Sequence, residues 1–340
     1  MKRAAVLAVD GGGSKVDAAL LARDGSVIAA TRVPNVNDGG EPFGYLDGVA
    51  AGVAEVVRSA GLDPERRPLA SLGVYCLAGA DLPADDRRIV RWLSGQGFST
   101  EDVLRNDTFA VLRAGTDRTW GVGIVCGFGT NCSGVAPDGR MYRLPAVGPI
   151  SGDWGGASEV GGAALWHALR AEDGRGSRTS LRGLVPEHFG LKRPRQVMEA
   201  VYFGRLPQDR LAELAPVVFR AAAAGDAVAW SIVDRQADEV VTMAGAAIRR
   251  LRMTRLDVHV VLGGGIFRNR LPGFVERIEE GVRRLCPGAS ITVLETPPLV
   301  GAAMLGLDRI GASKAAHARA HAALTHERLT QDTRGRAGKE

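Results

Sequence analysis

Three short apolar runs in this sequence each end in glycines. Residues 6–9 are apolar and lead directly into Asp10-Gly11-Gly12-Gly13-Ser14-Lys15, and the other two glycine groups are residues 127–129 and 263–265. Apolar runs that stop at glycine are typical of buried strands. Because glycine has no Cβ, the N–H groups of such a turn can approach an anion closely. The acid beside the first turn would repel a bare phosphate, so this segment favours a phosphate accompanied by a metal cation.

These glycine groups do not match the two common phosphate-binding motifs. The sequence contains no G-x-x-x-x-G-K-[ST], and its first two glycine groups do not complete G-x-G-x-x-G. Three separate turns instead favour a nucleotide held between two lobes. The alternative is that they are ordinary turns at strand ends.

A second acid, Asp107, follows a predicted short strand at 103–105 and precedes a predicted helix that begins at Thr108. One role for such a residue is the N-cap, which accepts hydrogen bonds from the first helical N–H groups. The other is a general base that takes a proton from a sugar hydroxyl during phosphoryl transfer, a reaction that depends mainly on positioning and charge neutralisation. Both roles stay open at this point.

Polar side chains in glycine- or proline-containing loops could bind the hydroxyl and acetamido groups of a sugar, with turn formation as the alternative role. They are Asn35, Asn37, Asn131 and Asp153. The neighbouring Trp154 could cover one face of the sugar or pack in the core.

The elements around the first two glycine turns repeat. Near residues 5–32 and again at 121–144, the pattern predicts a strand, the glycine turn, a strand, an Asp-Gly hairpin and a third strand. Such internal similarity predicts two related domains whose glycine turns could face each other across a cleft.

The remaining pattern sets the expected domain boundaries. Apolar residues at helical spacing predict further helices, including a last one at 299–307. From about residue 313 the chain shows little apolar pattern, which predicts disorder or a loose helix. The expected first lobe is residues 1–112 with about 299–312, the second is 113–298 with an insertion at about 152–209, and the tail at 313–340 is expected to be disordered.

Composition is that of an ordinary globular protein. The chain has 340 residues, of which 45% are hydrophobic and 24% charged, and a formal net charge of +5. No run approaches the roughly 20 apolar residues of a membrane helix, and no basic helix with aromatics suggests nucleic acid. Neither a membrane nor a nucleic acid is therefore an expected partner. The four cysteines, which form neither a CxxC pair nor a zinc spacing, are Cys76, Cys126, Cys132 and Cys286. We expect them to be reduced and the location to be cytoplasmic.

Together these motifs resemble the BadF/BadG/BcrA/BcrD ATPase family, and within it the N-acetylglucosamine kinase branch of the actin, Hsp70 and sugar-kinase superfamily. The segments that carry the resemblance are Asp10 to Lys15, Asn106-Asp107, Gly127 to Cys132, Gly152-Asp153 and Leu262 to Gly265. They occur in the family's order and at about its spacing, and the similarity covers about residues 4 to 310.

The resemblance implies an α/β fold of two ribonuclease-H-like lobes, with ATP and sugar in the cleft between them. It implies that Asp10 holds Mg²⁺ through water and that Asp107 is the catalytic base. It implies that ATP is bound by Gly11, Gly12, Gly13, Ser14, Lys15, Gly127, Gly129, Thr130, Gly263, Gly264 and Gly265. It implies that the sugar is bound by Asn35, Asn37, Asn131 and Asp153.

We therefore expect ATP-dependent phosphorylation of an amino sugar, with N-acetylglucosamine and its 6-hydroxyl as first choice, and a homodimer. Two residues depart from the family pattern. Phe128 stands where a threonine is usual, so the phosphate contact must come from the backbone or from Thr130. Trp154 stands where a glutamate is usual, so the sugar could differ. The alternatives are a sugar sensor or degenerate kinase without activity, and an ATPase that activates a reductase, which would need cysteines bridging an iron–sulfur cluster between subunits.

Overall fold

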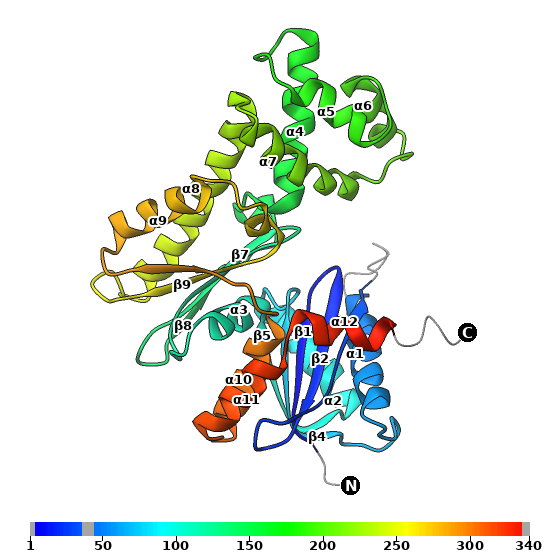
Figure 1. Cartoon of the computed structure of the whole chain (residues 1–340), viewed down its shortest axis with the longest axis vertical. Helices are drawn as coiled ribbons and strands as arrows, with labels where there is room; N and C mark the ends of the chain where they lie inside the picture. Colours follow the sequence, from blue (N-terminus) through cyan, green and yellow to red (C-terminus); the bar gives the residue numbers. More distant parts are fainter. Residues whose placement is uncertain (1–3, 36–43, 335–340) are drawn as a thin grey trace. The chain divides into compact units, whose positions relative to one another are not determined.

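The computed structural model describes residues 4–35 and 44–334, with side chains up to residue 330. The chain divides into two compact units, Met1–Gly123 with Thr292–Glu340, and Ile124–Ile291. The boundaries predicted from the sequence, after residues 112 and 298, differ from these. Each unit is built around a five-stranded sheet (Figure 1).

The first sheet has the order β3-β2-β1-β4-β5. Its strands are β1 (Ala4–Gly11), β2 (Lys15–Leu21), β3 (Val27–Pro34), β4 (Ala70–Leu77) and β5 (Ser99–Asn106). β1, β2 and β3 form an antiparallel meander, whereas β4 lies parallel to β1 and β5 parallel to β4. Asp10 pairs with Cys76, which pairs with Arg105. The carboxyl ends of β1, β4 and β5 therefore meet at one edge of the sheet.

Helices cover both faces of this sheet, because its central strand is apolar on both sides. Leu7 and Val9 of β1 pack in a core cluster with α1 (Tyr45–Ser59) and α2 (Pro83–Gln96). Val6 and Ala8 point the other way, into a cluster with α3 (Asp107–Gly115) and α10 (Leu299–Arg309). The sheet is thus held rigidly from both sides, which fixes the strand ends where the acids lie.

The tail, for which the sequence predicts disorder or a loose helix, contains two helices in its described part, α11 (Lys314–Ala323) and α12 (His326–Arg334). Ala320, Leu324 and Leu329 are buried in the same cluster as α10. The Arg328 guanidinium donates a hydrogen bond to the Val27 carbonyl of β3 at 3.1 Å. The sequence signal was weak because alanine supplies most of the contact face of α11, and alanine hardly raises the amphipathic pattern that marks a helix.

The second sheet repeats the first. Its strands are β6 (Gly121–Cys126), β7 (Thr130–Val135), β8 (Met141–Arg143), β9 (His259–Gly263) and β10 (Ser290–Val293). Their order, β10-β9-β6-β7-β8, is the order of the first sheet with five added to each strand number and read from the other end. The predicted duplication within an α/β fold is therefore confirmed.

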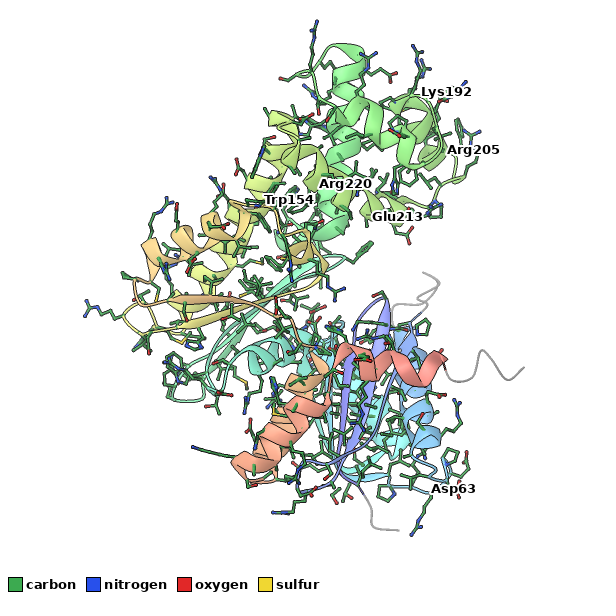
Figure 2. The ribbon with its side chains drawn as sticks, viewed as in Figure 1. Asp63, Trp154, Lys192, Arg205, Glu213 and Arg220 are labelled. Carbon is green, nitrogen blue, oxygen red and sulfur yellow. The ribbon has the colours of Figure 1, made fainter. Side chains whose placement is uncertain are left out.

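Helices make up most of the second unit beyond its sheet. They are η1 (Pro149–Ser151), α4 (Gly156–Asp173), α5 (Leu181–His188), α6 (Pro194–Tyr202), η2 (Gln208–Leu214), α7 (Ala215–Ala223), α8 (Ala227–Arg250), η3 (Gly265–Asn269) and α9 (Phe274–Leu285). The insertion expected from the sequence forms α4, α5 and α6. The His188 ring ties α5 to Glu213 of η2 at 3.1 Å. Glu213 is labelled in Figure 2.

Helix α8 begins at a well-formed N-cap. The Asp226 carboxylate accepts the N–H groups of Val228 and Ala229 at 2.9 and 3.0 Å. Its second oxygen accepts hydrogen bonds from the Thr179 and Ser180 hydroxyls, which ties the loop before α5 to the start of α8. Among the described residues, no single helix is long and apolar enough to cross a membrane, although one bent pair, Gln208–Ala223 with Ala227–Arg250, passes on length and composition.

Candidate functional site

Two acids lie at the same edge of the first sheet. Asp10 is the last residue but one of β1, and Asp107 directly follows β5. Because β1, β4 and β5 are parallel, their carboxyl ends bring both residues to the edge where open α/β sheets bind ligands. The two carboxyl groups are close enough for the charge of Asp107 to raise the pKa of Asp10.

Both acids have perturbed pKa values. Burial raises the pKa of Asp10 to about 7; the Lys15 ammonium opposes this, while the Asp17 and Asp107 carboxylates add to it. Burial also raises the pKa of Asp107 to about 6, against the lowering effect of the backbone N–H groups of Thr108 and Asp107. Perturbed carboxyl groups that cluster at a strand edge are typical of functional sites.

Of the two roles open to Asp107, the N-cap is taken by its neighbour. The Asn106 side chain accepts the Thr108 N–H at 3.1 Å and the Thr108 hydroxyl at 2.6 Å. Its amide group also donates to Asp81 at 2.9 Å, which fixes the rotamer of Asn106. Asp107 is the first helical residue of α3, and its carboxylate is not needed to start the helix.

The first glycine turn is closed by its own backbone and by Asn35. The Gly12 N–H donates to the Lys15 carbonyl at 3.0 Å. Asn35 donates twice to the turn, from its backbone N–H to the Ser14 carbonyl at 3.0 Å and from Nδ2 to the Gly12 carbonyl at 2.7 Å. Gly13 and Ser14 are exposed at the tip. The Asn35 Oδ1 is buried and has no hydrogen-bond partner within the described residues.

Buried ion pairs between side chains of β2 and β3 hold the same turn in place. Asp17 of β2 is fully buried and pairs across the sheet with Asp10. Its carboxylate binds both the Lys15 ammonium at 2.7 Å and the Arg32 guanidinium at 2.6 and 2.7 Å. Sequence reasoning missed Asp17 and Arg32. An acid inside the otherwise apolar strand 16–21 was the signal that could have found them.

In the second unit, the turn at 127–129 is joined to the start of α4. The Gly127 N–H donates to the Gly129 carbonyl at 2.9 Å, which closes the turn. The N–H groups of Ala157 and Ser158 then donate to the carbonyls of Gly127 and Phe128, each at 2.9 Å. The Phe128 ring, 59% exposed, projects from the turn.

The third glycine turn packs against the strand that leads into the second. Gly263 ends β9, and Gly265 begins η3. Between them Gly264 has φ +106°, and a Cβ there would lie 2.2 Å from the Cys126 carbonyl oxygen, so only glycine fits. The structure thus brings the second and third turns of the sequence together within one unit.

The polar residues beside the second turn are partly engaged within the protein. The Thr130 hydroxyl lies 3.2 Å from Cys126 Sγ and donates to Met243 Sδ at 3.7 Å. Asn131 is buried and accepts the Cys132 N–H at 2.7 Å. The exposed backbone of the turn, rather than the Thr130 hydroxyl, is therefore the better placed donor for an anion.

The loop after β8 contains Asp153, the predicted sugar-binding residue that lies furthest along the chain. Asp153 accepts a hydrogen bond from the Ser151 hydroxyl. The Trp154 ring is partly buried, with the Arg235 guanidinium 4.0 Å from its centroid in a cation–π contact. Trp154 thus packs on α8 by one face. The remaining predicted sugar residue, Asn37, lies outside the described residues.

The residues fit a magnesium ion that arrives with a nucleotide. In the part of the chain that the structure describes, no three His, Cys, Asp or Glu side chains are grouped so as to hold a metal. Mg²⁺ usually keeps several waters and is bound by one or two carboxylates together with phosphates. The buried carboxylate of Asp10, beside a glycine turn, matches that donor set.

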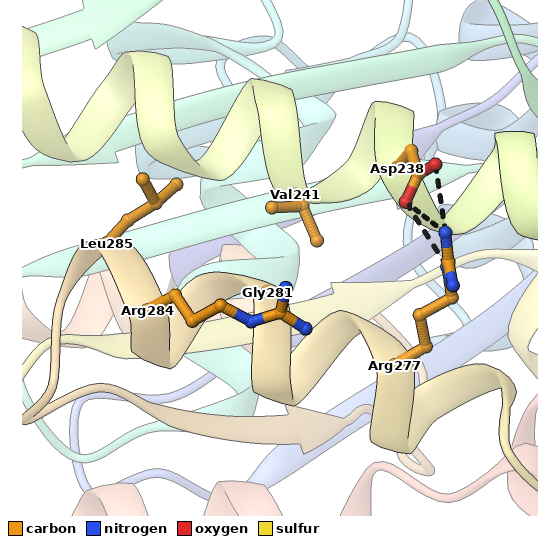
Figure 3. A pocket seen from close by; sticks show the side chains of 6 residues that line it. All are labelled: Asp238, Val241, Arg277, Gly281, Arg284 and Leu285. Carbon is orange, nitrogen blue, oxygen red and sulfur yellow. Dashed lines mark hydrogen bonds and ion pairs between the residues drawn. The ribbon is translucent and has the colours of Figure 1, made fainter.

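A separate surface pocket of about 300 Å³ lies between α8 and α9 (Figure 3). Arg277 of α9 closes one end by donating to Asp238 of α8 at 3.0 and 3.1 Å. The rest of the lining is Val241, Gly281, Arg284 and Leu285. None of the predicted site residues lines this pocket.

The repeated sheet, with acids and glycine turns at its strand ends, defines a duplicated α/β fold. The model of the BadF/BadG/BcrA/BcrD ATPase family matches residues 7–306, so the chain belongs to this family. The resemblance noted from the motifs is confirmed, and membership of an ATPase family implies use of ATP.

Three comparisons describe what the chain is similar to. It is 26% identical over 320 residues to the N-acetyl-D-glucosamine kinase of Dictyostelium discoideum, covering 91% of this chain and 99% of that one. It is 27% identical over 268 residues to the N-acetylmuramic acid/N-acetylglucosamine kinase of Clostridium acetobutylicum, covering 78% and 86%. The crystal structure of a proposed N-acetylglucosamine kinase from Chromobacterium violaceum superposes with TM-score 0.71 at 22% identity, covering 89% and 99%.

Proposed function

We propose that this protein is an ATP-dependent kinase that phosphorylates an amino sugar, with N-acetylglucosamine and its 6-hydroxyl as the first candidate acceptor. The observation that carries the proposal is the pair of acids, Asp10 and Asp107, at one edge of the first sheet with raised pKa values. The names of both curated relatives, an N-acetylglucosamine kinase and an N-acetylmuramic acid/N-acetylglucosamine kinase, support it.

In the proposed reaction Asp107 is the general base. Its carboxylate takes the proton of the sugar hydroxyl while the hydroxyl oxygen bonds to the γ-phosphorus, and the bond from that phosphorus to the leaving oxygen of ADP breaks. A base with a pKa of about 6 is mostly ionised at pH 7 and still accepts a proton readily. When bound, Mg²⁺ would neutralise charge on the phosphates, and Asp10 is the residue we propose to hold it through water.

The glycine turns at residues 11–13 in the first unit and at 127–129 and 263–265 in the second are proposed to bind ATP. The N–H groups of Gly12 and Gly127 close their own turns, so the proposed donors to ATP are other backbone N–H groups of these turns. Lys15 is held near the first turn by Asp17. Phe128 removes a side-chain hydroxyl from the second turn but not its backbone donors. The proposed sugar contacts are Asn35, Asn37, Asn131 and Asp153, and of these Asn35 has an unpartnered buried oxygen.

The alternative of a reductase activator is less well supported. An iron–sulfur cluster shared between subunits needs cysteines at the surface, whereas Cys76, Cys126, Cys132 and Cys286 are all buried. We retain the expectation of a homodimer as a proposal.

A coupled assay of ADP release over a panel of sugars tests the function. The panel contains N-acetylglucosamine, glucosamine, N-acetylmuramic acid and glucose, each with Mg²⁺ and ATP. We expect sugar-dependent release for at least one N-acetylated hexosamine and transfer of the γ-phosphate of ATP to that sugar. Calorimetric binding of a sugar with no release of ADP would instead favour the non-catalytic sensor.

A further inference from the structure

A polar side chain is buried in the apolar face of helix α8. Gln236 is fully buried, and its neighbours on that face, Val233, Ala237, Val240 and Met243, are buried as well. Burying an amide costs free energy unless both of its ends are hydrogen-bonded. Here Oε1 accepts the Gly156 N–H at 2.8 Å, and Nε2 lies 3.7 Å from Cys126 Sγ as its donor.

Cys126 and Gly156, the two hydrogen-bond partners of Gln236, lie at the ends of the loops that we propose to bind the nucleotide and the sugar. Cys126 is the last residue of β6 and precedes the turn at 127–129. Its carbonyl also contacts Gly264 of the third turn. Gly156 is the first residue of α4 and ends the loop that contains Asp153.

The two loops also touch each other, and the contact leaves no room for a side chain at Gly156. Gly156 has φ +78°, and a Cβ on it would lie 2.4 Å from the Gly129 carbonyl oxygen. The next two N–H groups, of Ala157 and Ser158, are bonded to the turn at 127–129. A shift of Gly156 would therefore move the second glycine turn and the Asp153 loop together.

We propose that Gln236 is a positioning residue that fixes the turn at 127–129 and the loop at 152–156 relative to each other. This inference rests on the proposed function, in which the turn contacts the nucleotide and the loop contacts the sugar. One amide supplies the acceptor for Gly156 and the donor for Cys126 at the same time. Methionine has a similar length but no such groups, and it would leave the buried Gly156 N–H without a partner.

The test compares Gln236→Met with Gln236→Glu and with a matched control. Val185→Ala removes buried volume from α5 and lowers stability, and Val185 takes part in neither hydrogen bond of Gln236. We expect Gln236→Met to raise the KM for ATP and the KM for the sugar together, each by about tenfold, the factor that corresponds to one lost hydrogen bond. Val185→Ala should lower the melting temperature and leave both KM values unchanged.

Gln236→Glu should keep the two hydrogen bonds in part, and the extent should depend on pH. A buried glutamic acid in its neutral form has an acceptor and a donor like glutamine, whereas its ionised form loses the donor and carries a buried charge. Relative to the wild-type protein at the same pH, Gln236→Glu should therefore be closer to normal at pH 6 than at pH 8.

Hydrogen exchange without ligands separates this inference from the proposed function. We expect faster exchange at the N–H groups of residues 156–158 in Gln236→Met and unchanged exchange there in Val185→Ala. Unchanged exchange in Gln236→Met, or unchanged KM values despite a lowered melting temperature, would overturn the positioning role. Absence of sugar-dependent turnover in the wild-type protein would overturn the kinase proposal, and the exchange result would still decide whether Gln236 fixes the two loops.

Discussion

Replacing Asp107 with asparagine should make the protein more stable and far less active at neutral pH. Burial raises the pKa of this carboxyl group from 3.8 to about 6. Between these two values the folded protein binds more protons than the unfolded chain, so the free energy of unfolding falls as the pH rises through this window. A shift of about 2 pKa units corresponds to about 3 kcal/mol, lost in full above pH 6.

Asparagine has nearly the same shape and carries no charge, so Asp107→Asn should recover about 1–3 kcal/mol at pH 8 and almost nothing near pH 4. It also removes a charge that raises the pKa of Asp10, which acts in the same direction. If Asp107 is the general base, kcat should fall by about 10²–10⁴-fold. The KM for the sugar should change little, because the amide oxygen still accepts a hydrogen bond.

The assay is urea unfolding of both proteins at several pH values between 4 and 8, together with steady-state kinetics. Asp63→Asn is a suitable control, because Asp63 is an exposed acid of the first unit and the asparagine keeps the acceptor for the Glu65 N–H (Figure 2). Its unfolding should follow the wild-type pH profile. The reasoning is refuted if Asp107→Asn is less stable than the wild type at pH 8, or if it keeps more than a tenth of the wild-type kcat.

Three further predictions concern other parts of the structure. Gly264→Ala should lower the melting temperature, because of its φ of +106° and the close Cys126 carbonyl, and should weaken ATP binding as a result. Gly265→Ala should leave the melting temperature unchanged, because a Cβ there would meet nothing within 4 Å; an equal fall in the melting temperature of both variants would contradict this account. Because burial raises the pKa of Asp10 to about 7, protons should compete with Mg²⁺ for its carboxylate. Calorimetry in the presence of ATP should therefore find a Mg²⁺ affinity that falls as the pH drops below 7. Asp10→Asn should reduce this fall to the dependence that ATP alone shows, since the terminal phosphate of ATP also titrates near this range. Asp226→Ala should destabilise the second unit by about 1–2 kcal/mol in chemical unfolding, and an unchanged midpoint would show that the cap of α8 contributes nothing.

Much of the fold could be predicted from local pattern. The two Asp-Gly hairpins and the apolar runs that stop at glycine mark three strands in each half, and their repetition predicts the duplicated sheet. The tail could not be predicted in this way. Ala316 and Ala320 are buried in α11, but alanine is too weakly apolar for its spacing to stand out. The two final helices are stabilised by their packing against α10 and β3.

In the candidate site, too, some residues could be predicted from the sequence and others could not. Asp10 and Asp107 were accessible from the sequence, because both follow predicted strands and the ends of parallel strands meet. Gln236 was not, since a single glutamine in a helix is normally a solvent-facing residue. Its meaning comes from contacts with Cys126 and Gly156, which lie 110 and 80 residues away in the chain. Supporting residues of this kind follow from packing rather than from motif.

The docked tail has a consequence for the behaviour of the protein in concentrated solution. β3 is an edge strand, and the backbone groups on an open edge are a template on which another chain can add a strand. Here α12 packs on β3, Leu329 covers an apolar face, and Arg328 binds the Val27 carbonyl. Removal of the chain after Ile310 would uncover this strand, and we expect concentration-dependent self-association that light scattering can follow. The last two helices, which lie beyond the matched family segment, would thus protect the protein from aggregation.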